Sequence, residues 1–321
     1  MKRSLLFGSA ALAAFVVLAS TPAQAAASQN ADDRDTAQMI VTVESKHHGQ
    51  PAPQVEKEDL AVSVGGRRAS VLSWSALNEQ DTPTELFLVL DDSSRVGAVG
   101  THIAELRKFL RGLPSAVSTA VGYMTNGRVQ VAEALTADHE AAAMAVRLPG
   151  GSAGSNASPY FALADLAKHW PAPTANARRV VLWLTDGIDP YDTTMDLSQD
   201  IYLQAAVADA QRAGIQVYSI YLAGKGGIDR SMYGVNQGQS KLSVVAEQTG
   251  GYAYNQGFTS PVSLVPYLGD FSQRLNNQYR LVFEAVGARA ALEDVRIKTE
   301  VPGVALTSAS KVYLLPVFKG D

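Results

Sequence analysis

An apolar run that ends in carboxylates and hydroxyls is the most informative feature of the sequence. Residues 86–97 read LFLVLDDSSRVG, so Asp91, Asp92 and Ser93 follow the apolar run directly, with Arg95 two residues further on. A second apolar run, RRVVLWLTDG, ends in Asp186. Carboxylate and hydroxyl oxygens are the ligands that Mg²⁺, Mn²⁺ and Ca²⁺ prefer. If the two runs are neighbouring strands, their ends form a candidate cation site.

The surrounding pattern predicts how these side chains are positioned. Both runs have the continuous apolar character of strands that are buried on two faces of a parallel sheet. From Leu86 to Asn276 such runs alternate with helical periodicity, for example over 99–113. Residues 229–239 are expected to be a loop, which is either a protein-binding surface or an ordinary long insertion. This alternation predicts an α/β fold with a doubly wound, mostly parallel sheet and helices on both faces. Because ligands bind beyond the carboxyl ends of such strands, Asp91 and Asp186 are expected at one edge.

Segments with strand periodicity flank this α/β part on both sides. Residues 38–80 include an alternating run at 39–45 and a hairpin signal at Gly65-Gly66, and residues 277–319 contain further alternating runs. We expect one small β domain formed by both flanks, with the α/β domain, 84–276, inserted in it. Residues 26–37 are polar and aperiodic, which favours a flexible leader.

The N-terminal segment has the order of a secretory signal. Lys2 and Arg3 precede an apolar stretch, and the small-residue site Ala23-Gln24-Ala25 follows it, so residues 1–25 are expected to be a signal peptide. The protein is therefore expected to be exported, either periplasmic or secreted, with no integral membrane segment after signal removal. The chain has no cysteine and a formal net charge of -4. A net negative charge gives no electrostatic reason to expect binding to nucleic acid or to an anionic membrane surface.

Three stretches together resemble a known family. LVLDDSS, GSNASPYFAL and VVLWLTDG resemble the von Willebrand factor A (VWA) domain with its metal ion-dependent adhesion site, and the flanks resemble exported VWFA-related proteins abundant in Acidobacteria. The resemblance implies a Rossmann-like fold and a protein partner. It also implies that Asp91 and Ser93 are the first two metal ligands, that Ser158 takes the place of the family's loop threonine, and that Asp186 is the last ligand.

Arg95 departs from the family pattern, which has a second serine at this position. A guanidinium has no lone pair to offer a metal and stays charged. If Arg95 points inward, it replaces the cation between Asp91 and Asp186 and could bind a partner's carboxylate directly. If it points to solvent, the remaining ligands could hold a weakly bound Mg²⁺ or Mn²⁺, or less readily Ca²⁺. Asp92 is grouped with Arg95 as a partner-binding or metal-replacing residue.

Two functional classes follow from this edge. The first is an adhesion-type module that is not an enzyme and binds a protein partner at a degenerate metal ion-dependent site. The alternative is a metal-dependent hydrolase that uses the same carboxylates, but no motif ties a general base to them. Asp189 and Asp192 follow Asp186 closely and would add negative charge to the same edge, but their expected role is in turns and at a helix N-terminus.

Overall fold

The computed structural model describes residues 36–47, 49–78, 82–92, 94–150, 158–171, 174, 176–192, 194, 196–224, 231–255, 257–285 and 290–314, with the backbone alone at 94–97. The expected signal peptide and most of the expected leader lie outside these residues. The first strand begins at Thr36, inside the segment expected to be the leader. Among the described residues, no helix is both long enough and apolar enough to cross a membrane.

The central element is a six-stranded sheet in the order β7-β6-β5-β8-β9-β10. Its strands are β5 (Thr84–Asp91), β6 (Val117–Thr125), β7 (Arg128–Thr136), β8 (Arg178–Thr185), β9 (Ile215–Tyr221) and β10 (Ala253–Tyr254). All neighbours are parallel except β7, which forms an antiparallel hairpin with β6. Numbered along the chain, the order is 3-2-1-4-5-6, which is typical of doubly wound folds.

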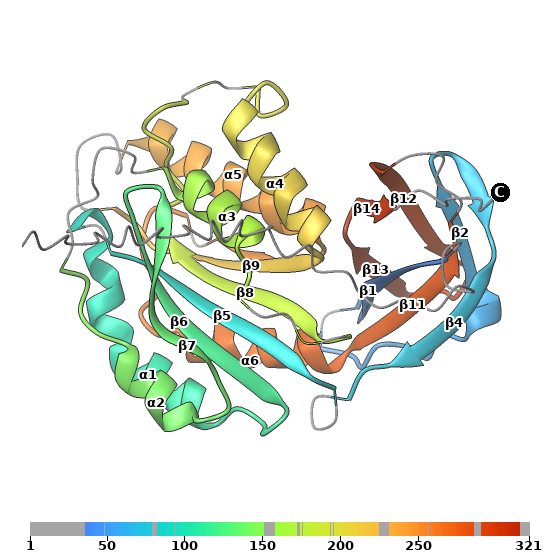
Figure 1. Cartoon of the computed structure of the whole chain (residues 1–321), viewed down its shortest axis with the longest axis horizontal. Coiled ribbons are helices and arrows are strands. Elements are labelled where there is room, and N and C mark those ends of the chain that lie inside the picture. Colours follow the sequence, from blue (N-terminus) through green and yellow to red (C-terminus); the bar gives the residue numbers. More distant parts are fainter. Residues whose placement is uncertain are drawn as a thin grey trace, which may run out of the picture.

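Helices cover both faces of this sheet (Figure 1). On one face lie α1 (Ile103–Arg111), α2 (His139–Ala145) and α6 (Val265–Asn276), which contribute Leu106, Ala142 and Phe271 to one apolar core. On the other face lie α3 (Pro159–Lys168), α4 (Ile201–Ala213) and α5 (Met232–Thr249), which contribute Leu163, Leu203 and Leu242 to a second core. The predicted doubly wound α/β fold is confirmed.

Strands from both flanks of the α/β part form two further four-stranded sheets, which we call the β domain. One sheet has the order β13-β1-β11-β4 and the other the order β14-β12-β2-β3. The strands are β1 (Thr36–Ser45), β2 (Leu60–Val64), β3 (Arg67–Ala69), β4 (Val71–Ala76), β11 (Gln278–Glu284), β12 (Ala291–Thr299), β13 (Val304–Ser308) and β14 (Lys311–Leu314). Apolar side chains of both sheets share a third core, which includes Val41 and Phe283 from the first sheet and Val62 and Val295 from the second.

Two local expectations differ from the structure. The helix expected over 99–113 is divided into a 3₁₀ helix, η3 (Ser94–His102), and the α-helix α1. Gly97 and Gly100 lie in η3, where their low α-helix propensity favours the departure from α geometry. The loop expected over 229–239 is largely the start of α5, because the Ser231 side chain accepts a hydrogen bond from the Gly234 N–H and caps the helix.

Candidate functional site

The carboxyl ends of β5 and β8 bring Asp91 and Asp186 to the same edge of the sheet. The two strands pair in parallel, with Leu90 opposite Leu184, so each aspartate lies at or just after the end of its strand. Thr185 donates a hydrogen bond to Asp91 Oδ2 at 3.1 Å. The chain turns to β6 on one side of this pair and to β9 on the other, so the aspartates lie at the topological switch point where ligands bind in such folds.

The turn after β8 is fixed by close backbone packing against α5. Asp186 Oδ1 accepts a hydrogen bond from the Ile188 N–H at 3.0 Å, and Gly187 has a φ of +68°. A Cβ atom on Gly187 would lie 2.6 Å from the Gly238 carbonyl oxygen, and one on Gly238 would lie 2.2 Å from the Asp186 carbonyl oxygen. Two glycines are therefore required for α5 to lie directly on the turn that carries Asp186.

Ser158 joins the site through Asp189. Ser158 precedes α3 and is 2% exposed, yet its side chain makes no capping hydrogen bond to the helix. Instead its hydroxyl donates to Asp189 Oδ2 at 3.0 Å, and Asp189 Oδ1 accepts from the Tyr191 N–H at 2.9 Å. Burial raises the pKa of the Asp189 carboxyl, although these two hydrogen bonds and Lys241 oppose the shift. Asp189 is therefore a buried residue of the candidate site. It makes the turn contact expected for it, with the Tyr191 N–H, and it also binds Ser158.

Lys241 places a buried positive charge beside this cluster. Its ammonium lies 2.6 Å from Asp200 Oδ2, and both side chains are fully buried. The ammonium also donates to the Asp192 carbonyl oxygen at 2.7 Å and lies 5.6 Å from the centre of the Tyr160 ring. Asp200 in turn caps α4 by accepting from the N–H groups of Tyr202 and Leu203. One side chain of α5 thus holds both ends of the segment between Asp192 and Asp200.

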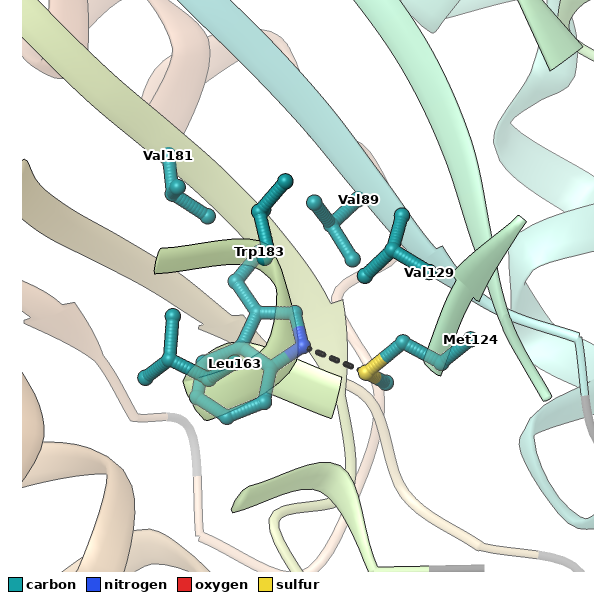
Figure 2. Close-up of a pocket in the computed structure, with 7 residues that line it drawn as sticks. Val89, Met124, Val129, Leu163, Val181 and Trp183 are labelled. Atoms are coloured by element: carbon teal, nitrogen blue, oxygen red, sulfur yellow. Dashed lines mark hydrogen bonds between the residues drawn. The ribbon is translucent and has the colours of Figure 1, made fainter. Parts of the chain in front are cut away.

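Tyr160 connects the site to the apolar layer beneath it. Its hydroxyl donates to the Gly187 carbonyl oxygen at 2.7 Å, and its ring packs edge-on against Trp183. Burial, together with the charges of Asp189, Asp200 and Asp186, holds the pKa of Tyr160 well above its usual value, so the hydroxyl remains a donor. Figure 2 shows the next layer, in which the indole N–H of Trp183 points at the Met124 sulfur, 2.9 Å away, among Val89, Val129 and Leu163.

Asp92 is held by an ion pair with Arg147. The two guanidinium nitrogens lie 2.8 and 3.0 Å from the two carboxylate oxygens, and the Gly150 N–H donates to Oδ1 at 3.0 Å. The guanidinium also lies 3.9 Å from the centre of the Tyr123 ring. These contacts hold Arg147 and Gly150, in the segment after α2, against the end of β5. A partner that bound Asp92 would therefore compete with an internal bidentate pair.

Some of the predicted site residues lie together in the structure, and others fall outside the described residues. The structure brings Asp91, Asp186 and Ser158 to one edge, the last of them through Asp189. Ser93 and the Arg95 side chain lie outside the described residues, although the backbone at residue 95 belongs to η3. Lys241 was missed by the sequence analysis. The available signal was a lysine on the buried side of an amphipathic helix, between Gly238 and Val245.

The donor set fits a hard divalent cation. Asp91, Ser158, Asp186 and Asp189 supply carboxylate and hydroxyl oxygens from three separate segments, and all four are nearly or fully buried. Within the described residues, no three His, Cys, Asp or Glu side chains form a metal cluster by themselves. A cation here would therefore use hydroxyl and water oxygens as well as carboxylates.

No protein-family model matches the sequence, and no curated protein matches it. Among solved structures, the chain is similar to an aerotolerance-related membrane protein from Bacteroides fragilis NCTC 9343, with 16% identity over 60% of this chain and 98% of that chain and a TM-score of 0.42. It is similar to the manganese-loaded TRAP protein from Plasmodium vivax, with 12% identity over 77% and 99% of the chains and a TM-score of 0.42. It is also similar to the SpRpn10 VWA domain, with 10% identity over 60% and 95% of the chains and a TM-score of 0.38. These likenesses are too distant to assign a function, and the fold rests on the strand order and registers above.

Proposed function

We propose that this protein is an exported interaction module that binds a carboxylate of a protein partner at the edge formed by β5 and β8. Asp91, Ser93, Ser158 and Asp186 would hold a divalent cation, Mg²⁺ or Mn²⁺, and the partner's carboxylate would complete its coordination. The bound ion would supply a Lewis-acidic contact for that carboxylate. Arg95 is the competing group, because an inward guanidinium would occupy the place of the ion and bind the carboxylate itself.

One observation supports this proposal: buried side chains with oxygen donors, from separate segments, lie at the carboxyl edge of β5 and β8. Hydrogen bonds from Thr185 to Asp91 and from Ser158 to Asp189 hold carboxylates from the ends of both central strands in place. Side chains held in this way bind with a smaller entropic cost than mobile ones. The hydrolase alternative needs a general base beside a metal-bound water, and no observation favours it over binding.

Calorimetric titration of Mn²⁺ and Mg²⁺ into metal-stripped protein tests the site. We expect saturable binding by the wild type and none by Asp186→Ala, because the substitution removes a buried carboxylate of the donor set. Asp196→Ala is the matched control, since Asp196 is an exposed carboxylate of the same loop whose side chain accepts hydrogen bonds from nearby Ser198. Binding by Arg95→Ser alone would show that the arginine takes the place of the ion. Equal binding by wild type and Asp186→Ala would contradict the ligand set.

A further inference from the structure

The outer face of the β14-β12-β2-β3 sheet carries a group of basic side chains. The strand registers place Ser63 of β2 opposite Arg296 on one side and opposite Arg68 on the other. Lys298 lies opposite Ala61 in the neighbouring row, and Lys311 of β14 lies opposite Asp294 of β12. We call Arg68, Arg296, Lys298 and Lys311 the basic face.

Alternation along the strands shows that these side chains point away from the core. Val62, Val295 and Val312 are the intervening residues, and all three belong to the apolar core between the two sheets of the β domain. Because successive residues of a strand point to opposite faces, the basic residues must lie on the outer side. Arg68, Arg296 and Lys298 are exposed, as this placement requires.

The positive charge of this face is largely uncompensated. Within the described part of the chain, no ion pair joins Arg68, Arg296 or Lys298 to a carboxylate. Lys311 pairs with Asp294 at 3.3 Å, with side chains that are 40% and 72% exposed, so this contact is open to water and weak. In the described part of a chain with a net charge of -4, one sheet face thus carries three cations that form no ion pair there.

The shape of the face suits an extended anionic surface. Arg68 and Arg296 are two strand spacings apart, about 10 Å, and Arg296 and Lys298 are about 7 Å apart along β12. The floor between them consists of the small residues Ala61 and Ser63. At one end of the face Tyr313, which is 36% exposed, lies opposite Leu292. A two-dimensional set of cations bordered by an amphipathic ring matches the headgroup region of a bilayer better than it matches a linear polyanion.

We propose that the basic face binds an anionic phospholipid surface. The face belongs to the β domain, which packs at the amino ends of the parallel strands, where Arg178 at the start of β8 bonds to Gln278 of β11. The candidate cation site is at the opposite, carboxyl ends of the same strands (Figure 1). The β domain that carries the basic face and the candidate cation site therefore lie at opposite ends of the parallel strands.

Vesicle co-sedimentation tests this proposal. At about 0.1 M salt, where the Debye length is about 10 Å, we expect the protein to bind vesicles of phosphatidylcholine with phosphatidylglycerol, and not vesicles of phosphatidylcholine alone. Binding should be lost at about 1 M salt, where that length falls to about 3 Å. Each lysine or arginine near an anionic membrane contributes roughly fivefold in affinity, so the triple variant Arg68→Gln, Arg296→Gln, Lys298→Gln should bind about a hundredfold more weakly.

A charge-matched control distinguishes an effect of the basic face from an effect of the protein's net charge. The triple variant Lys57→Gln, Lys108→Gln, Arg128→Gln removes the same number of exposed cations elsewhere and should bind like the wild type. Equal weakening of both variants would overturn the proposal, as would equal binding to both kinds of vesicle. Binding to soluble polyphosphate without binding to vesicles would also overturn it. The variant of the basic face should bind Mn²⁺ as the wild type does. A failure of the membrane-binding proposal can therefore be distinguished from a failure of the proposed function.

Discussion

Replacing Lys241 with methionine is expected to lower the free energy of unfolding by about 3–5 kcal/mol, because it leaves the fully buried Asp200 carboxylate without its cation. The variant also loses the hydrogen bond to the Asp192 carbonyl oxygen. Urea denaturation, followed by tryptophan fluorescence, measures the change. The size of the effect follows from burial, since a buried charge cannot turn to water for solvation.

A second substitution tests the origin of this loss. Adding Asp200→Asn to Lys241→Met removes the unpaired charge while keeping an oxygen that caps α4, so the double variant should regain much of the lost stability. Lys168→Met is the matched control, because Lys168 pairs with Asp209 but is 59% exposed, and its loss should cost less than about 1 kcal/mol. A double variant no more stable than Lys241→Met would contradict the role given to the ion pair.

Gly238→Ala is expected to lower the free energy of unfolding by about 1–3 kcal/mol, although the same change usually stabilises a helix. The added Cβ would lie 2.2 Å from the Asp186 carbonyl oxygen, so α5 or the Asp186-Gly187 turn must move. Because that turn carries a proposed ligand, the variant should also bind Mn²⁺ more weakly. Urea denaturation and calorimetry measure the two effects.

Gly269→Ala in α6 is expected to change the free energy of unfolding in the opposite direction. A Cβ at Gly269 meets no atom within 4 Å, so the substitution should stabilise the protein by roughly 0.5–1 kcal/mol, as expected for an unobstructed helix position. If both substitutions stabilise the protein, the close packing of α5 on the site is not a real constraint.

The apolar runs of β5 and β8 carried most of the predictable information. Long apolar strands followed by Asp91 and Asp186 indicated a parallel sheet with carboxylates at one edge, since buried strands and ligand edges leave local patterns in the sequence. Helical periodicity indicated the helix that contains α1, but it showed neither the 3₁₀ helix before α1 nor the first residues of α5. These features depend on neighbouring residues, which a single sequence shows directly.

Contacts between distant segments left no such pattern. Arg147 meets Asp92 from 55 positions away, and Ser158 meets Asp189 from 31, so their spacing did not reveal the pairs. Lys241 follows a stretch that was expected to be a loop, so its place on the buried side of α5 and its pairing with Asp200 were not predicted. The basic face could not be predicted from the net charge, because the net charge does not show where individual charges lie. The strand registers place Arg68, Arg296 and Lys298 on one side of one sheet.

Capture of a partner's carboxylate by the bound cation is tested most directly by the water-proton relaxation rate of protein-bound Mn²⁺, measured while a short peptide that carries one aspartate is added. We expect the peptide to lower the relaxation enhancement, because its carboxylate displaces water from the bound ion, and we expect the same peptide with asparagine to leave it unchanged. An unchanged enhancement with the aspartate peptide at saturating Mn²⁺ would contradict capture of a carboxylate through the cation.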